Sequence, residues 1–345
     1  MLTIKIIKPK KIKLGDTVGI FTPSFPGNVT FKEKYLHGIS ELKRLGFNVI
    51  EGELTKKCVK QGYRSGTPRE RAQEFMALIK NDNVDFLMST IGGYNSSSML
   101  EYLDFEEIRT QRKIIVGYSD VTALHMAILT QAQLSTFYGP AVVPTFGEWP
   151  HVLKESLESF LLMGSDSSMI NYTLPIFEKW SNHFRDATTN EWKNAEREYF
   201  PNTGYKVLSP GVVEGSVVIA NLNTLCALAG TKYFPDLKNK ILLIEEQDAP
   251  FAEEERSLTQ LKIMGVFDMI KGLIIGKAEL LNSQGAPFGY EGLIMEVVGL
   301  RKYPIISHFD CGHTHPMHTM AQMIPIKLDA STSDVKIKIL ESAVE

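Results

Sequence analysis

The chain has 345 residues, 43% of them hydrophobic and 22% charged, as in an ordinary soluble globular protein. Lys and Arg number 37 against 40 Asp and Glu, so no basic excess indicates a nucleic-acid polymer as partner. No apolar stretch approaches membrane-spanning length, and the first residues lack the continuous apolar segment of a signal peptide. The three cysteines argue against a disulfide framework. These features predict a cytoplasmic protein, and the length favours two domains.

The first half of the chain alternates short apolar segments with helical patterns. We expect strands over residues 17–21, 47–50, 84–91 and 112–116, and helices over 31–45 and from 67 to about 79. The second helix begins with Thr67-Pro68-Arg69-Glu70, which has the threonine, first-turn proline and glutamate of a capping box. Strands joined by helix-length segments predict a parallel, three-layer α/β domain of the Rossmann or flavodoxin-like type. In such a sheet, ligands bind beyond the carboxyl ends of the strands.

The pattern changes after about residue 163, where aromatic residues lie among polar ones without a sustained period. So long a connection is either a functional loop or an insertion that its aromatic side chains anchor to one domain. From Val212 onward, apolar strands alternate again with helix-length segments, and residues 324–340 are rich in strand patterns. We expect an N-terminal domain over residues 1–165, a connection over 166–205, and a smaller, strand-rich C-terminal α/β domain over 206–345.

One serine stands where an apolar strand passes into a helical pattern, within Gly117-Tyr118-Ser119-Asp120. A serine at such an elbow is held out at the carboxyl edge of the sheet, where the amides that open the helix stabilise an oxyanion. The fit is imperfect, because Val121 occupies the place of the second glycine in the hydrolase consensus. Taken alone, the tetrapeptide is more often a turn with a helix cap.

Two further groups of residues are candidates for a catalytic acid and for metal ligands. Glu245 and Glu246 end an apolar strand, where a carboxylate can be held near buried surface, although paired acids at a strand end are usually solvated. Alternation along an extended segment would place Cys311, His313 and His315 on one face, a possible set of metal ligands. A metal-dependent hydrolase therefore stays open as a minority alternative.

Taken in order along nearly the whole chain, short motifs resemble those of the LD-carboxypeptidase family of serine peptidases, which includes the microcin C immunity peptidases. The motifs are Thr22-Pro23-Ser24, Gly66-Thr67, Ile91-Gly92-Gly93-Tyr94-Asn95, Gly117-Tyr118-Ser119-Asp120-Val121-Thr122-Ala123-Leu124, Asn221-Leu222, Gly230-Thr231, Phe234-Pro235-Asp236-Leu237, Leu243-Ile244-Glu245-Glu246, Leu258-Thr259-Gln260-Leu261 and Gly312-His313-Thr314. The resemblance implies an N-terminal domain that carries the nucleophile, a C-terminal domain that carries the other catalytic residues, a homodimer, and neither metal nor cofactor.

The resemblance also implies a catalytic triad of Ser119, Glu245 and His313. A serine hydroxyl needs an adjacent base near neutral pH, and an imidazole oriented by a carboxylate supplies one. The backbone amides of Gly93 and Asp120 are the natural oxyanion donors, the second because it follows the nucleophile.

The substrate is harder to predict than the chemistry. Gly312-His313-Thr314-His315-Pro316-Met317 and the aromatic connection look more like the microcin type, which cuts the amide joining an aminoacyl or peptidyl group to a modified nucleotide. The alternative is the murein-recycling type, which releases the terminal D-alanine of a muropeptide. Some microcin-type members carry a lysine shortly after the triad glutamate, whereas Gln247-Asp248-Ala249-Pro250 has none. A non-enzymatic protein that binds a small molecule between two lobes is a third possibility.

Substrate contacts are expected from two sets of side chains. Trp180 or Trp192 of the connection would stack on a nucleobase. Further contacts are expected from Tyr94, Asn95, Asn221 and His315.

Overall fold

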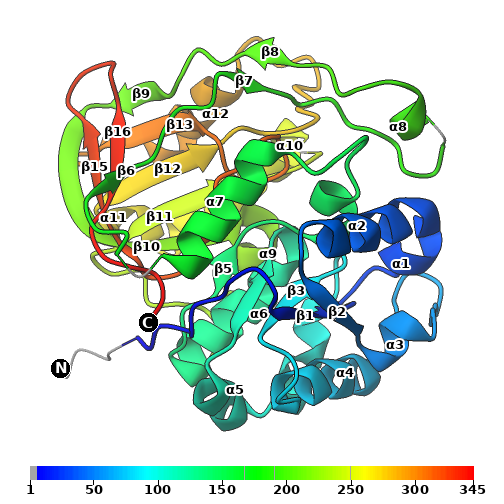
Figure 1. Cartoon of the computed structure of the whole chain (residues 1–345). Helices are drawn as coiled ribbons and strands as arrows, with labels where there is room; N and C mark the ends of the chain where they lie inside the picture. The colour runs from blue at the N-terminus through cyan, green and yellow to red at the C-terminus, as the bar shows by residue number, and fades with distance from the viewer. Residues whose placement is uncertain (1–5, 167, 190, 249) are drawn as a thin grey trace.

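A computed structural model describes residues 6–166, 168–189, 191–248 and 250–345, and Figure 1 shows that they form two α/β domains. The strands are β1 (Thr17–Phe21), β2 (Asn48–Glu51), β3 (Phe86–Ser89), β4 (Ile114–Gly117), β5 (Phe137–Tyr138), β6 (Tyr172–Thr173), β7 (Lys179–Trp180), β8 (Phe200–Pro201), β9 (Lys206–Ser209), β10 (Gly211–Asn221), β11 (Ile241–Glu245), β12 (Gly272–Gly276), β13 (Ile305–Phe309), β14 (Met320–Ala321), β15 (Pro325–Ala330) and β16 (Lys336–Ile339).

The helices surround these strands and include four short segments of tighter or wider pitch. The α-helices are α1 (Gly27–Thr30), α2 (Lys32–Arg44), α3 (Glu53–Lys56), α4 (Pro68–Lys80), α5 (Phe105–Gln111), α6 (Thr122–Ala127), α7 (Lys154–Ser165), α8 (Glu191–Asn194), α9 (Leu222–Ala227), α10 (Phe251–Ile263), α11 (Val266–Met269) and α12 (Tyr290–Val298). The others are the 3₁₀ segments η1 (Ser96–Tyr102) and η2 (Ser119–Val121) and the π segments η3 (Ile128–Ala132) and η4 (Val142–Phe146).

The N-terminal sheet has the strand order β14-β5-β4-β3-β1-β2. Its strands β1 to β5 run parallel to one another, as the alternation of strands and helices predicts. β3 and β4 are buried along their whole length, which explains their continuous apolar sequences. The predicted capping box is confirmed, since the Thr67 side chain accepts from the Glu70 amide and Glu70 reaches back to the Thr67 amide. The edge strand β14 comes from the C-terminal part of the chain and pairs antiparallel with β5.

The C-terminal sheet has the order β6-β16-β15-β10-β11-β12-β13-β9. Its centre, β10 to β13, is parallel, while β15 and β16 add the antiparallel strands expected from residues 324–340. β11 is buried throughout and ends at Glu245, so this carboxylate is carried to the carboxyl edge of a parallel sheet. The carboxyl ends of β4 and β11 both border the space between the two domains.

The connection between the domains runs along the top of Figure 1 from β7 to α8 and back to β8. It is anchored at both ends of this path. Ser181 and His315 exchange backbone hydrogen bonds of 2.7 and 3.0 Å, and the Asn202 side chain donates to Asp310 at 3.0 Å. Both of these contacts are made to the C-terminal domain, whereas the ion pair between Lys193 and Glu33 joins the connection to the N-terminal domain. Among all the described residues, no helix is both long and apolar enough to cross a membrane.

Candidate active site

Ser119 occupies a strained elbow between β4 and the helical segment that leads into α6. Its φ of 62° lies in the left-handed region, which a non-glycine residue adopts only when its surroundings hold it there. One support is the Tyr138 hydroxyl, which accepts from the Ser119 amide at 3.0 Å. Gly92 supplies another, because a Cβ there would lie 3.0 Å from the Ser119 Cβ and 3.1 Å from its Oγ. The neighbouring loop therefore approaches the serine as closely as glycine allows.

Glu245 and His313 are joined by a hydrogen bond of 2.6 Å between Oε2 and the ring nitrogen Nδ1. Both side chains are buried, at 1% and 6% exposure. The second oxygen of Glu245 accepts from the Tyr138 hydroxyl, so Tyr138 links the carboxylate to the Ser119 backbone. Gly312 has a φ of 118°, and a Cβ there would collide with the Glu245 carboxylate. Glycine is thus required immediately before the histidine.

The electrostatics of this pair favour a basic imidazole. Burial lowers the pKa of His313, but the charge and hydrogen bond of Glu245 more than compensate, so the pKa lies above its usual value. Burial and the charge of Glu245 raise the pKa of Tyr138, which stays protonated and can donate. The imidazole Nδ1 is occupied by Glu245, which leaves Nε2 as the nitrogen available for proton transfer.

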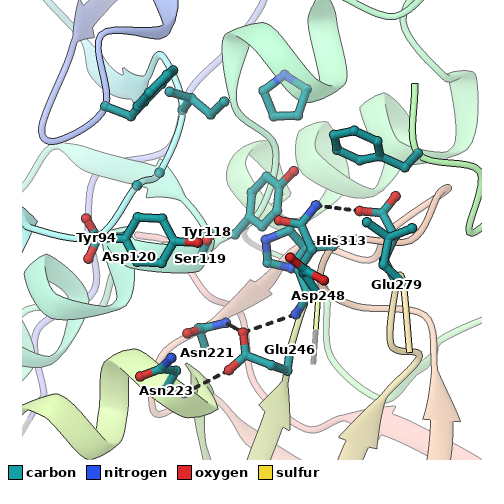
Figure 2. A pocket seen from close by; sticks show the side chains of 18 of the residues that line it. Tyr94, Tyr118, Ser119, Asp120, Asn221, Asn223, Glu246, Asp248, Glu279 and His313 are labelled. Carbon is teal, nitrogen blue, oxygen red and sulfur yellow. Dashed lines mark hydrogen bonds between the residues drawn. The ribbon is translucent and has the colours of Figure 1, made fainter. Parts of the chain in front are cut away.

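Glu246 has a different set of partners from its neighbour. It accepts from the Asn221 side chain at 2.8 Å and from the Asn223 amide at 2.9 Å, contacts drawn in Figure 2. Burial and the nearby Glu245 raise the pKa of Glu246. Of the two adjacent acids, Glu245 is therefore the one that contacts the histidine.

Ser119, Glu246 and His313 line a cleft of about 750 Å³ between the domains. Figure 2 shows Tyr94, Ser119 and Asp120 on one side, and Glu246, Asp248 and Glu279 on the side of the C-terminal domain. The ring of Tyr118 packs edge-on against the His313 imidazole, with centroids 4.9 Å apart, so the elbow and the histidine adjoin. A cleft of this size accommodates a peptide or nucleotide.

Several other predicted residues also line the cleft, namely Gly93, Tyr94, Asp120, Asn221 and His315. Gly93 has a φ of 144°, a conformation that suits glycine. Tyr94 is 92% exposed, whereas Asn221 is buried and caps α9 by accepting from the Thr224 amide at 3.1 Å. Asn95 is not part of the lining, because its side chain is bound by Ser24 at 2.8 Å and by Arg71.

The two tryptophans expected to stack on a base are not part of the lining. Trp192 is 3% exposed and packs edge-on against Trp149, with ring centroids 6.2 Å apart. Trp180 is half-buried, and the Lys277 ammonium lies 5.4 Å from the centre of its ring. Both indoles anchor the connection, which was the alternative explanation of its aromatic composition.

The proposed metal ligands do not form a site. Among the described residues, no group of three or more His, Cys, Asp or Glu side chains is arranged to hold a metal ion. The segment from Cys311 to His315 is not a regular strand, so the alternation on which that alternative rested does not occur. The His313 nitrogen that faces Glu245 is also already in use.

Sequence reasoning missed two features of the site. Tyr138 ends the very short strand β5, and nothing in its local sequence marks a link between nucleophile and acid. Glu148 forms buried ion pairs with Arg185 and Arg197 of the connection, a pairing across 37 and 49 positions that sequence spacing does not reveal. The abundance of charged residues in the connection was the available signal.

Comparison with known proteins identifies the family. Residues 18–139 match the LD-carboxypeptidase N-terminal domain, and residues 214–328 match the LD-carboxypeptidase C-terminal domain. The chain belongs to the LD-carboxypeptidase family. It is a serine peptidase, as the resemblance of its motifs implied, and the non-enzymatic alternative is wrong.

The relatives include both types considered above. The chain is 39% identical to microcin C7 self-immunity protein MccF of Escherichia coli over 94% of each chain. It is 26% identical to a probable murein peptide carboxypeptidase of Bacillus subtilis, over 98% of this chain and 95% of the relative. A solved structure of MccF in complex with aspartyl sulfamoyl adenosine superposes with a TM-score of 0.93 at 37% identity, covering 98% of this chain and all of that one. The complex of MccF with glutamyl sulfamoyl guanosine gives the same TM-score at 36% identity, with 98% and 99% coverage.

Proposed function

We propose that this peptidase hydrolyses the amide that joins an aminoacyl or peptidyl group to a modified nucleotide, using Ser119, His313 and Glu245 as its triad. The observation that supports the triad best is the buried 2.6 Å hydrogen bond between Glu245 and His313, in the same cleft as the strained serine. Strain of this kind persists where function needs a side chain in one exposed position.

In this mechanism His313 accepts the Ser119 proton through Nε2 as Oγ attacks the carbonyl carbon. The oxyanion is bound by the backbone amides of Gly93 and Asp120, which border the serine. Glu245 stabilises the imidazolium, which then protonates the departing nitrogen. Water next attacks the acyl-enzyme with His313 again as base, and the acid is released. Tyr138 fixes the second oxygen of Glu245, so the carboxylate keeps its orientation through both steps.

The nucleotide substrate is supported by the similarity to MccF, whose structures hold aspartyl sulfamoyl adenosine and glutamyl sulfamoyl guanosine. Of the aromatic rings that line the cleft, those of Tyr94 and Phe184 are largely open to solvent, at 92% and 50% exposure. We assign the base-stacking role to these two rings in place of the buried tryptophans. The residues that follow the triad acid, Gln247 to Pro250, lack the lysine that some microcin-type members carry there, so the nucleotide portion would be held differently here.

The second candidate function is removal of the terminal D-alanine from a muropeptide. It is supported by the relative named as a probable murein peptide carboxypeptidase, which aligns with nearly the whole chain. The same triad would carry out this reaction, so the two functions differ only in the groups bound beside it.

The test is a cleavage panel of aminoacyl-sulfamoyl adenosines and muropeptide tetrapeptides, followed by mass spectrometry. We expect the nucleotides to be cleaved at the acyl–nitrogen bond and Ser119→Ala to abolish cleavage while leaving the melting temperature unchanged. Ser97→Ala, a change of the same size in the cleft lining, is the matched control. Activity retained by Ser119→Ala would refute the serine mechanism, and cleavage of muropeptides alone would favour the second function.

A further inference from the structure

Three of the sequence motifs described above contain no member of the triad, yet they meet at one buried side chain, Arg71 of α4, which is 1% exposed. The motifs are Thr22-Pro23-Ser24, Gly66-Thr67 and Ile91-Gly92-Gly93-Tyr94-Asn95. The guanidinium group donates to the carbonyl of Pro23 at 2.5 Å and to the carbonyl of Gly66 at 3.0 Å. It also donates to the carbonyl of Asn95 at 3.0 Å and to the side-chain oxygen of Asn95 at 3.2 Å. Arg71 therefore joins three segments that lie apart in the sequence.

Arg71 is buried without a counter-charge beside it. Its other hydrogen bond goes to the Ser98 hydroxyl at 2.8 Å, so among the described residues every acceptor of the guanidinium group is uncharged. Burying a cation without an acidic partner costs free energy, which an apolar side chain at this position would avoid. The planar fork of an arginine can, however, hold several carbonyl groups in fixed directions. The arginine therefore serves the arrangement of the segments that it joins.

One of these segments, residues 92–95, is held from a second side by Ser24, and we call it the oxyanion loop. Ser24 is buried, and its hydroxyl accepts from the amides of Tyr94 and Asn95, each at 3.1 Å. The same hydroxyl donates to the side-chain oxygen of Asn95 at 2.8 Å. That oxygen thus accepts from both Ser24 and Arg71, and the loop is fixed through its backbone and through the Asn95 side chain.

The Gly93 amide is left free by this arrangement. Within the part of the chain that the structure describes it makes no hydrogen bond, although the two amides that follow it both bind Ser24. Gly93 packs so closely on Ser24 that a Cβ there would collide with the hydroxyl, so the loop has little room to turn. A Cβ on the preceding Gly92 would lie 3.0 Å from that of Ser119 and 3.2 Å from the Asp120 amide. The loop therefore presents an unused amide beside the nucleophile, which suits the binding of an oxyanion.

The described lining of the cleft includes Gly93 but not Arg71, Ser24 or Asn95, so these three side chains can act on a substrate only through the loop. Resting on the proposed function, we propose that Arg71, Asn95 and Ser24 are positioning residues that hold the Gly93 amide toward the oxyanion of the transition state. Negative charge develops on that oxygen only during the reaction, so the network raises kcat and leaves the affinity for the substrate unchanged. Nucleotide and muropeptide substrates share this step, and the network serves both alike.

The experiment replaces Arg71 by methionine and measures kcat for aspartyl-sulfamoyl adenosine together with the melting temperature. Methionine is unbranched and fills much of the same space without a donor. We expect kcat to fall about ten- to a hundredfold, the effect of moving a catalytic group by about 1 Å. Arg69→Met is the matched control, because Arg69 lies on the same helix but is exposed, and its replacement should leave kcat unchanged.

Substrate affinity is measured separately, by calorimetry in the Ser119→Ala background. We expect the addition of Arg71→Met to change Kd less than about threefold, because the substrate carries no oxyanion before the reaction begins. This difference between kcat and Kd separates positioning from a structural role. A residue that only stabilised the fold would lower the melting temperature and leave the kcat of the folded protein unchanged.

A pair of substitutions at Asn95 keeps the test independent of how well Arg71→Met folds. Asn95→Asp retains the oxygen that accepts from Ser24 and Arg71, so kcat should stay within about threefold of wild type. Asn95→Leu has a similar shape but no acceptor, and kcat should fall about tenfold or more.

A kcat within about threefold of wild type in Asn95→Leu, or in folded Arg71→Met, would overturn the inference. Equal losses in Asn95→Asp and Asn95→Leu would also overturn it, and so would a rise in Kd as large as the loss of kcat. Failure of the wild type to cleave either nucleotides or muropeptides would instead refute the proposed function, and with it this inference.

Discussion

Replacement of Glu245 by glutamine tests the proposed triad most directly. The change preserves the volume of a side chain that is 1% exposed and removes only its charge. It disturbs the two shortest contacts of the carboxylate, because Oε2 accepts from His313 and Oε1 accepts from the Tyr138 hydroxyl. An amide can satisfy one of these donors with its oxygen but presents N–H groups to the other. The variant therefore either loses the tautomer that leaves Nε2 free or loses the link to the serine elbow.

The expected magnitude follows from the role of the carboxylate. In a serine protease, an equivalent acid-to-amide change lowers kcat by about 10⁴-fold, because it traps the wrong tautomer and removes the stabilising charge. We expect a fall of about 10³- to 10⁴-fold here, since the His313–Glu245 pair is also buried and its hydrogen bond is short. Glu246→Gln is the matched control. It keeps the strand and changes an acid whose partners are Asn221 and Asn223, so its activity should stay within about tenfold of wild type.

The pH dependence gives a second readout with a definite sign. Glu245 raises the pKa of His313 against the lowering effect of burial, and glutamine removes that contribution. The acidic limb of the pH profile of kcat/KM should therefore move to lower pH in the variant, because the His313 imidazole then loses its proton at a lower pH. A folded-state pKa above the unfolded value also stabilises the fold at low pH, and this contribution is lost as pH rises through the folded pKa. The stability difference between wild type and variant should thus be larger near pH 6 than near pH 9.

The assay is initial-rate hydrolysis of aspartyl-sulfamoyl adenosine across this pH range, with urea unfolding of both proteins at its two ends. A loss of less than about tenfold, or an acidic limb that does not move, would refute the assignment of Glu245 as the acid that orients the base. A larger loss of kcat in Glu246→Gln than in Glu245→Gln would mean that Glu246, and not Glu245, orients the histidine.

Three further changes have clear expected outcomes. Gly92→Ala would press a methyl group against Ser119, so we expect kcat to fall at least about tenfold with little change in melting temperature; wild-type kcat would contradict the close approach. Glu148→Gln would leave two buried arginines without their counter-charge, and urea unfolding should show a loss of about 3–5 kcal/mol, whereas a loss below about 1 kcal/mol would mean that the pairs contribute little. Trp192→Ala should lower the melting temperature and reduce turnover of nucleotide and muropeptide substrates alike, and a rise in KM confined to nucleotides would restore its stacking role.

The sequence predicted the regular elements well where local chemistry determines them. The capping box at Thr67 defined the start of α4, and continuous apolar segments located β1, β3 and β4 to within three residues. The order of motifs also identified the family. These features depend on neighbours a few positions away, which a single sequence displays directly.

The features that sequence reasoning missed all depend on contacts between distant segments. An indole can stack on a base, which is why the sequence suggested Trp192 for this role. Its ring is instead buried against Trp149, and this burial depends on how the connection packs. Tyr138 reaches Glu245 across 107 positions. The prediction that Cys311, His313 and His315 share one face was wrong, because this segment is not a regular strand. Its backbone is instead constrained by the close packing of Gly312 against Glu245.

The pairing of β14 with β5 has a consequence for synthesis and folding. β14 lies 182 positions after β5 in the chain (from Tyr138 to Met320), so the N-terminal sheet lacks its edge strand until nearly the whole polypeptide has left the ribosome. Until then β5 presents an unpaired edge, the kind of surface on which strands of other chains add. The segment that closes this edge begins just after His313. A nascent chain therefore gains its protected sheet and its histidine in the same late event, and a truncated chain would lack both.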